Sequence, residues 1–155
     1  MTTEKDGTHT GDRETIRVGD DELVFRVTSD QSGGAVLAYE ARLRPGGGPP
    51  VLHRHAGHEL CRVDSGEMTL YVEDEQGRLR REVAGPGATV QIPGGREHTI
   101  RNESADEAVA FVVFTPGAEM ERFVRAAASA REMRDVLRLA SEHGIEMTRP
   151  LEEVA

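Results

Sequence analysis

The sequence contains no tryptophan, two tyrosines, four phenylalanines and a single cysteine, Cys61. One cysteine cannot form a disulfide within the chain, which fits a reducing compartment. No run of about 18 apolar residues occurs, so we expect no membrane-spanning helix. The first residues, MTTEKDGTHTGDRE, include no apolar stretch and do not resemble a secretory signal. We therefore expect a soluble, cytoplasmic protein.

Positive charge is also scarce, with 19 Lys and Arg against 28 Asp and Glu and a net charge of -9. Because nucleic acids are bound through clustered Lys and Arg, we expect no nucleic-acid partner. The same charge balance argues against binding to an anionic membrane surface.

Glycine, by contrast, is abundant, at 17 of 155 residues. This exceeds the average of roughly 7% and indicates many tight turns. A chain of this length forms one domain by the usual prior and can bury about two thirds of its unfolded surface. The composition therefore predicts a single, turn-rich core.

Three segments are expected along the chain. Residues 1–14 are polar and without periodicity, which predicts a disordered tail. Residues 15–116 consist of short apolar runs, several of them alternating, separated by turns that contain Gly or Pro. This pattern is typical of strands in a β-sandwich or barrel. Residues 117–155 are rich in helix formers and predict a helical segment that packs on the outside of the barrel.

Two helices are expected in that last segment. The first covers about 118–128, and the second ends near Gly144, which suits a helix C-terminus. Apolar residues recur at helical spacing in both helices, and we expect them to face the core. In the first helix they are Met120, Phe123, Val124 and Ala127, and in the second Met133, Val136, Leu137 and Ala140.

Residues 46–66, GGGPPVLHRHAGHELCRVDSG, concentrate histidine in a frame of glycine and proline. On a strand, residues two apart point the same way, so His53 and His55 present their imidazoles to one side. Glu59 follows and could fold back toward them. Two imidazoles and a carboxylate suit a divalent first-row metal. The alternative is a surface hairpin that happens to be rich in His and Glu.

A second segment, residues 87–102, reads GATVQIPGGREHTIRN and supplies His98 after a Pro-Gly-Gly turn. That turn could direct His98 into a barrel interior, next to the first three groups. Unpaired polar groups in a small apolar interior each cost several kcal/mol, and shared coordination of a metal would satisfy them.

The two segments together resemble the cupins. The cupin motif G-x5-H-x-H-x3/4-E-x6-G is met by Gly47, His53, His55, Glu59 and Gly66. The second motif, G-x5-P-x-G-x2-H-x3-N, is met by Gly87, Pro93, Gly95, His98 and Asn102. A looser likeness, over roughly residues 15–150, is to small single-domain cupins of the quercetin-dioxygenase-like type.

The resemblance implies a mainly β fold, a double-stranded β-helix or jelly-roll barrel, here with C-terminal α-helices. It implies one divalent transition metal (Fe, Mn, Ni, Cu or Zn) held by His53, His55, Glu59 and His98. It also implies a small-molecule substrate and a homodimer, since exposed strand edges favour pairing.

Several neighbours of these four residues can be assigned from strand alternation. Residues that share the ligand face could line a pocket or fill the core, namely Val51, Cys61, Val63 and Ile100. His58 is expected to point away from the metal. Arg96, Glu97 and the charges of 121–138 are expected to be solvated.

Three functions stay open, because this fold supports several chemistries. The first is a metal-dependent dioxygenase, in which Glu59 acts as the catalytic base toward a substrate hydroxyl. The second is a non-redox zinc enzyme, a polyketide cyclase or isomerase. The third is a barrel that binds a small ligand without catalysis.

Overall fold

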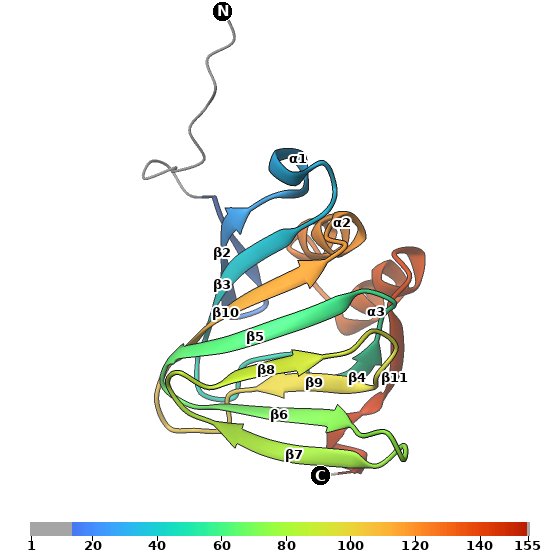
Figure 1. The fold of residues 1–155 in the computed structure, drawn as a ribbon. Coiled ribbons are helices and arrows are strands. Elements are labelled where there is room, and N and C mark those ends of the chain that lie inside the picture. Colours follow the sequence, from blue (N-terminus) through green and yellow to red (C-terminus); the bar gives the residue numbers. More distant parts are fainter. Residues whose placement is uncertain (1–13, 155) are drawn as a thin grey trace, which may run out of the picture.

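The structure is a computed structural model that describes residues 14–154 of the chain. The predicted tail, residues 1–14, lies outside the described residues except for Glu14. That residue is anchored, because its backbone oxygen accepts a hydrogen bond from the Phe25 N–H and its carboxylate pairs with Arg125. The fold is mainly β, as the sequence predicts, with two antiparallel sheets and C-terminal helices (Figure 1).

The larger sheet has six strands in the order β1-β2-β3-β10-β5-β8. Their bounds are Thr15–Val18 for β1, Asp21–Val27 for β2, Leu37–Leu43 for β3, Ala108–Thr115 for β10, His58–Ser65 for β5 and Thr89–Ile92 for β8. The central strand β10 pairs with both β3 and β5. This sheet therefore joins the N-terminal hairpin to the strand that carries Glu59.

The smaller sheet has five strands in the order β11-β4-β9-β6-β7. Their bounds are Glu146–Pro150 for β11, Val51–Arg54 for β4, His98–Arg101 for β9, Met68–Glu73 for β6 and Leu79–Ala84 for β7. Strands β4 and β9 pair at one position only, His53 opposite His98. The register of the sheet thus places these two histidines side by side.

Alternation along the strands separates the core from the surface. In β5, His58, Leu60 and Arg62 are exposed whereas Glu59, Cys61 and Val63 are buried. Side chains that point inward from both sheets make one main hydrophobic cluster. Burial of one face per strand is what the period of two in the sequence predicts. The hydrophobic effect therefore fixes which side of β5 faces the interior.

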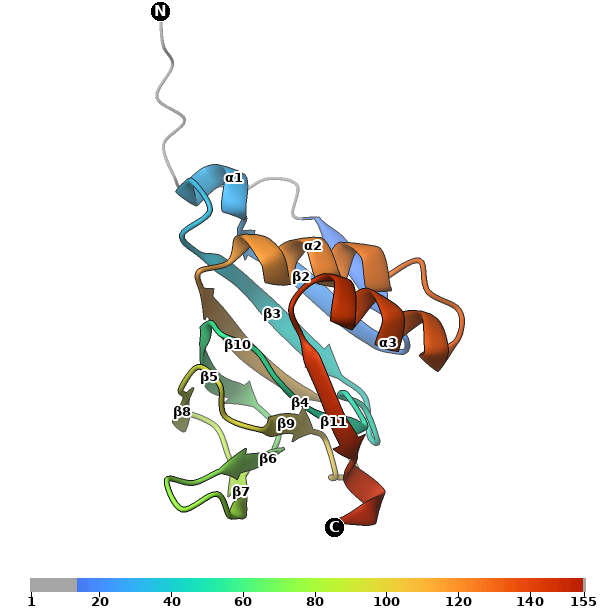
Figure 2. The same cartoon turned by 90° about the vertical axis from the view of Figure 1, so that its right-hand side faces the viewer.

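The helices are α1 (Ser29–Ser32), α2 (Ala118–Ala127), α3 (Met133–Glu142) and the short 3-10 turn η1 (Leu151–Glu153). Figures 1 and 2 show α2 and α3 beside each other, on one side of the sheets. Helix α2 buries Val124 and Ala127, as its spacing predicts. The prediction for α3 is only partly right, because Ala140 is buried while Met133 and Leu137 stay exposed.

The charged residues of these helices also differ from the prediction at one position. Glu121 is buried rather than solvated. Its carboxylate accepts a hydrogen bond from the backbone N–H of Ser29 at 2.7 Å and pairs with Arg125 at 3.1 Å. These contacts join α2 to the first residue of α1.

The C-terminal segment contains a strand that the sequence does not reveal. Strand β11 pairs with β4 and lies beside it in both views (Figures 1 and 2). Its sequence, EMTRP, has no clear alternation of apolar and polar residues. It is a strand because β4 offers an edge of unpaired N–H and C=O groups, and such an edge recruits a neighbouring segment. Among the described residues, no helix is long and apolar enough to cross a membrane.

The loop of residues 46–50 leads into β4 and is held by the second motif. The N–H of Gly46 donates to the carbonyl of Asn102, and the N–H of Asn102 donates to the carbonyl of Gly47. The fully buried Asn102 side chain also donates to the carbonyls of Leu43 and Asp106. Hydrogen bonds to and from the backbone therefore connect the two motifs, independently of any ligand.

Gly48 is the tightest point of this loop, and its substitution tests the loop's importance. Its φ is +93°, and a Cβ there would collide with the carbonyl oxygen of Ile100 on β9. We expect Gly48→Ala to lower the free energy of unfolding by roughly 3 kcal/mol or more, since both strain and a backbone clash arise. Urea denaturation measures the change.

Gly77→Ala is the matched control. Gly77 has a similar φ of +76°, but no atom lies within 4 Å of the added Cβ. We expect this variant to lose only about 1 kcal/mol, from backbone strain alone. Equal losses in the two variants would show that the contact of Gly48 with β9 is unimportant.

Candidate metal centre

The four residues selected by the two motifs meet in the interior. His53 lies on β4, His55 directly follows that strand, Glu59 lies on β5 and His98 begins β9. One ring nitrogen from each histidine lies within 4.8 Å of those of the other two. The ring centroids of His53 and His98 are 4.5 Å apart, and those of His55 and His98 are 4.9 Å apart. Among residues 14–154, three imidazoles thus form one cluster.

Glu59 borders this cluster. Its Oε2 atom lies 3.2 Å from Nε2 of His55 and 3.0 Å from Nε2 of His98. The carboxylate is nearly sealed from solvent, with Glu59 6% exposed. Two segments that are far apart in the sequence therefore share one buried carboxylate.

Backbone carbonyls fix the orientation of all three rings. Nδ1 of His53 lies 3.0 Å from the carbonyl oxygen of Val51, and Nδ1 of His55 lies 3.0 Å from that of Gly57. Nδ1 of His98 lies 2.8 Å from the carbonyl oxygen of Arg96. Since a carbonyl oxygen can only accept, each Nδ1 carries the hydrogen, and a neutral ring then keeps its lone pair on Nε2.

This arrangement concentrates lone pairs at one point. In neutral rings, Nε2 of His55 and His98 have no hydrogen to donate to Glu59, so lone pairs would face a carboxylate oxygen. A proton or a metal cation between them removes the repulsion. Nδ1 bonded to a carbonyl with Nε2 free is the usual arrangement of a metal-binding histidine. Three imidazoles beside a carboxylate suit the divalent first-row metals.

The pKa values reflect the same crowding. Burial, together with the nearby His98, lowers the pKa of His53 to about 4. Burial opposes the charged form of Glu59, but its contacts with His55 and His98, which donate hydrogen bonds when their rings are protonated, outweigh it and hold the pKa of Glu59 below its usual value. Burial likewise opposes the charge of His98, yet its contact with Glu59 raises the pKa of His98. Glu59 therefore favours positive charge beside it.

The histidine cluster opens on a cavity of about 520 Å³. Its walls are mostly aliphatic and aromatic, and come from both sheets and from α2 and α3. The helix residues Met120, Phe123 and Val136 belong to the lining. The apolar faces of the two helices thus close the cavity, in addition to packing on the barrel. A volume of this size fits a small organic molecule.

The four residues expected to line a pocket divide into two pairs. Val51 and Ile100 line the cavity. Cys61 and Val63 do not belong to the lining and are packed in the core, with exposures of 0% and 1%. They share the inward face of Glu59 but lie farther along β5, where side chains from both sheets fill the barrel.

His58 points to the outside, as strand alternation predicts. It is exposed, and its Nδ1 accepts a hydrogen bond from the Gly94 N–H at 3.3 Å. That bond holds the Pro-Gly-Gly turn that precedes His98. His58 therefore contacts the loop of one cluster residue without belonging to the cluster.

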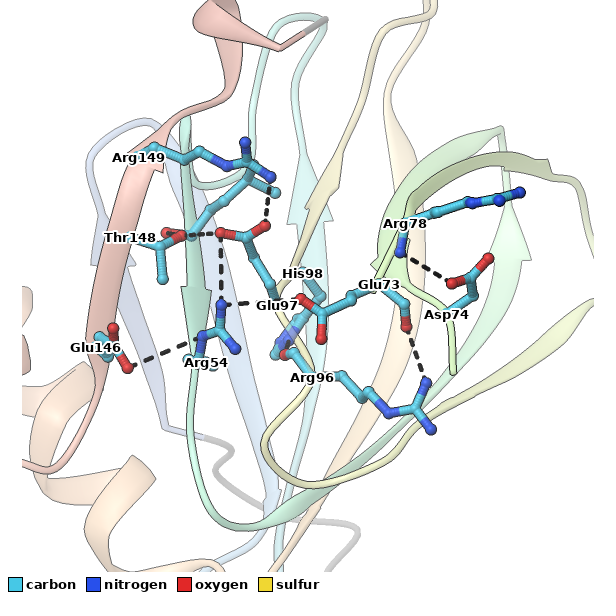
Figure 3. A network of polar contacts seen from close by, with 11 residues as sticks. Arg54, Glu73, Asp74, Arg78, Arg96, Glu97, His98, Glu146, Thr148 and Arg149 are labelled. Atoms are coloured by element: carbon cyan, nitrogen blue, oxygen red, sulfur yellow. Dashed lines mark hydrogen bonds and ion pairs between the residues drawn. The ribbon is translucent and has the colours of Figure 1, made fainter. Parts of the chain in front are cut away.

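A network of charges lies next to His98 (Figure 3). Glu97 is 4% exposed, and its carboxylate accepts hydrogen bonds from Thr148 and, at 2.7 Å, from Arg149. Arg54 lies 3.9 Å from Glu97 and 3.8 Å from Glu73. The network links β4, β6 and β11 to the residue just before His98.

The prediction that Glu97 is solvated is therefore wrong, and Arg96 is half-buried. Arg96 donates to the backbone carbonyl of Glu73 at 3.1 Å, and Glu97 is buried. Sequence reasoning missed both because their partners lie on β6 and β11, far away along the chain. Tyr39 on β3 was missed as well, although it lines the cavity. The alternation of L-A-Y-E-A-R-L is the signal that marks Tyr39 as inward-facing.

A jelly-roll barrel with a histidine cluster and an apolar cavity defines the class of protein. Residues 39–114 match the family model of the cupin domain. The chain therefore belongs to the cupin superfamily. No curated protein sequence matches it significantly.

Solved structures share this fold. A sugar phosphate isomerase of the cupin superfamily from Silicibacter pomeroyi is 22% identical, with a TM-score of 0.53, over 68% of this chain and 71% of its own. The polyketide cyclase RemF from Streptomyces resistomycificus is 23% identical, with a TM-score of 0.57, over 68% of this chain and 75% of its own. Oxalate decarboxylase from Bacillus subtilis is 21% identical, with a TM-score of 0.60, over 93% of this chain but only 43% of its own. At these identities the likeness establishes the fold.

The Glu97 network yields a prediction about stability and pH. Burial opposes its ionisation, but hydrogen bonds from Arg149 and Thr148 outweigh this and lower the pKa of Glu97. A carboxyl whose folded-state pKa is lowered stabilises the fold above its unfolded pKa and loses that effect as pH falls through the folded value. We expect Glu97→Gln to lower the free energy of unfolding at neutral pH, and the deficit to shrink below about pH 4.5.

Denaturant unfolding over a range of pH measures this deficit. Glu82→Gln is the control, because Glu82 is exposed on β7 and takes part in no ion pair with the described residues. A deficit that is independent of pH would contradict the electrostatic origin.

Cys61 yields a second prediction. Its side chain is fully buried, and burial, together with the charge of Glu59, raises the pKa of the thiol to about 12. Because the thiolate is the reactive form, we expect a thiol reagent to label native protein at mildly alkaline pH no faster than the protein unfolds. Labelling kinetics with and without denaturant test this, and rapid labelling of native protein would show that Cys61 is accessible.

Proposed function

We propose that this cupin is a metal-dependent enzyme that acts on a small, largely apolar organic molecule, and that its reaction is a dioxygenation. The observation that carries the proposal is the convergence of three Nε2 lone pairs and a carboxylate at the wall of an apolar cavity. His53, His55 and His98 would hold a divalent Fe, Mn, Ni or Cu ion, with Glu59 beside them.

The metal would supply Lewis acidity toward a substrate oxygen, together with redox capacity. Glu59 lines the cavity and touches two of the histidines, so its carboxylate can accept a proton from a substrate hydroxyl at Oε2. The apolar walls would exclude water from the deprotonated substrate. In a dioxygenation both atoms of O₂ enter the organic product, and the substrate supplies the electrons, so no separate reductant is needed.

The cavity also bears on the choice of substrate. Its lining is mostly aliphatic and aromatic, and a small dianion such as oxalate would leave most of about 520 Å³ empty. An apolar molecule that carries an enol or phenol oxygen suits the walls better.

Metal content is the first test. We expect elemental analysis of untagged protein to find about one equivalent of Fe, Mn, Ni or Cu. Metal loading should raise the free energy of unfolding, by about 2.7 kcal/mol when free metal is at a hundredfold excess over Kd. His98→Gln should lower metal affinity at least about tenfold, whereas His58→Gln should not. Protein that takes up no metal would overturn the proposal.

Oxygen uptake in the presence of enols and phenols tests the reaction. We expect Glu59→Gln to keep most of the metal, which the three histidines hold, but to lower the rate of oxygen consumption at least about a hundredfold. Native zinc, with no oxygen uptake, would contradict the dioxygenation and favour a non-redox cyclase or isomerase.

A further inference from the structure

Tyr39 occupies a rigid position in the cavity wall. Its ring packs between those of Phe25, at a centroid distance of 6.3 Å, and Phe114, at 5.6 Å. Phe114 in turn packs against the ring of His55 at 5.9 Å. Strands β2, β3 and β10 thus contribute a row of rings that ends at the histidine cluster. The position of the Tyr39 hydroxyl is fixed by this packing.

The hydroxyl of Tyr39 has no hydrogen-bond partner among residues 14–154, although the residue is only 8% exposed. Among the same residues, only two polar side-chain atoms are both without a hydrogen-bond partner and fully buried, namely Asp21 Oδ1 and Arg54 Nε. The Tyr39 hydroxyl is not one of them. Since Tyr39 lines the cavity, its hydroxyl opens into that space.

Most other polar side chains of the lining, outside the histidine cluster, have partners or are exposed, and the unpaired Oδ1 atom of Asp21 is sealed from solvent. Asp21 accepts a hydrogen bond from the Gly48 N–H at 3.0 Å, and Arg101 donates to the carbonyls of Gly46 and Gly48. Tyr39 carries the one hydroxyl among the described residues of the lining. Outside the histidine cluster, it is therefore the group best placed to bond to a ligand.

The chemistry of this hydroxyl defines what it can recognise. Burial, with the nearby charges of Glu59 and Asp21, raises the pKa of Tyr39 well above its usual value. The phenol therefore keeps its proton and can donate a hydrogen bond. A donor without a partner in apolar surroundings is unfavourable, so a ligand that supplies an acceptor gains affinity.

We propose that Tyr39 is a specificity-determining residue whose hydroxyl donates a hydrogen bond to an acceptor oxygen of the substrate. The substrate class is then a largely apolar molecule with one metal-binding oxygen and a second, separate carbonyl-type oxygen. This inference rests on the proposed metal site, because the metal would fix the first oxygen.

Alkyl hydroxamates test the proposal, since their head group binds metals and their tail suits the cavity. In a matched series, one methylene of the tail is replaced by a carbonyl at successive positions. We expect zinc-loaded protein to bind one member of the series at least about tenfold more tightly than the other carbonyl isomers. In Tyr39→Phe that preference should disappear, while the affinity for the plain alkyl hydroxamate stays within about twofold. Calorimetry measures each Kd.

Fluorescence gives a second readout. The chain has two tyrosines and no tryptophan, so Tyr71→Phe leaves Tyr39 as the only strong fluorophore. The Tyr71 hydroxyl bonds to Glu103 and Arg81 and does not reach the cavity. We expect Tyr71→Phe to keep the carbonyl preference, and the preferred hydroxamate to change its emission more than the plain one does.

The outcomes separate the two proposals. If plain hydroxamates bind the zinc-loaded protein but no carbonyl position is preferred, or if the preference survives Tyr39→Phe, the role of Tyr39 is wrong and the metal site stands. If no hydroxamate binds zinc-loaded protein more tightly than metal-free protein, the metal site itself fails, and the inference fails with it.

Discussion

Three hydrogen bonds from imidazole Nδ1 groups to backbone carbonyls are the constraint on which this structure depends. They turn the Nε2 atoms of His53, His55 and His98 toward one another, and those of His55 and His98 lie next to Glu59. The accepting carbonyls belong to residues within two positions of each histidine, so the backbone path of β4 and of the turn before β9 sets the geometry. The glycine-rich loop and Asn102 hold that path.

The two faces of the smaller sheet carry different kinds of side chain. Inward, β4 and β9 present histidines to an apolar cavity, where a cation would be weakly screened and strongly held. Outward, Arg54 and Glu97 join the same strands to β6 and β11 through charges. Strands β4 and β9 pair at a single position, so few backbone hydrogen bonds hold them together. The outer charges therefore stabilise the contact between these two strands.

Much of this could be read from the sequence. Alternation predicted the buried face of β5, and the spacing of the two motifs selected the four residues that meet inside the barrel. Other features escaped because they depend on partners far away in the chain. Strand β11 exists because β4 has a free edge, Glu97 is buried because β11 covers it, and Leu137 is exposed although its helical spacing suggests a core position.

The sequence by itself determined the β-rich fold and the set of donor groups, since strand period and motif spacing are local properties of the chain. Only the tertiary structure decided what surrounds those donors. Whether an inward side chain lines the cavity or fills the core depends on the elements that pack opposite it. Val51 and Ile100 line the cavity whereas Cys61 and Val63 do not, and Tyr39 reaches it from the other sheet. Contacts between segments that are distant in the sequence determine these positions. In a closely packed interior, the neighbouring side chains leave each residue only one place to fit.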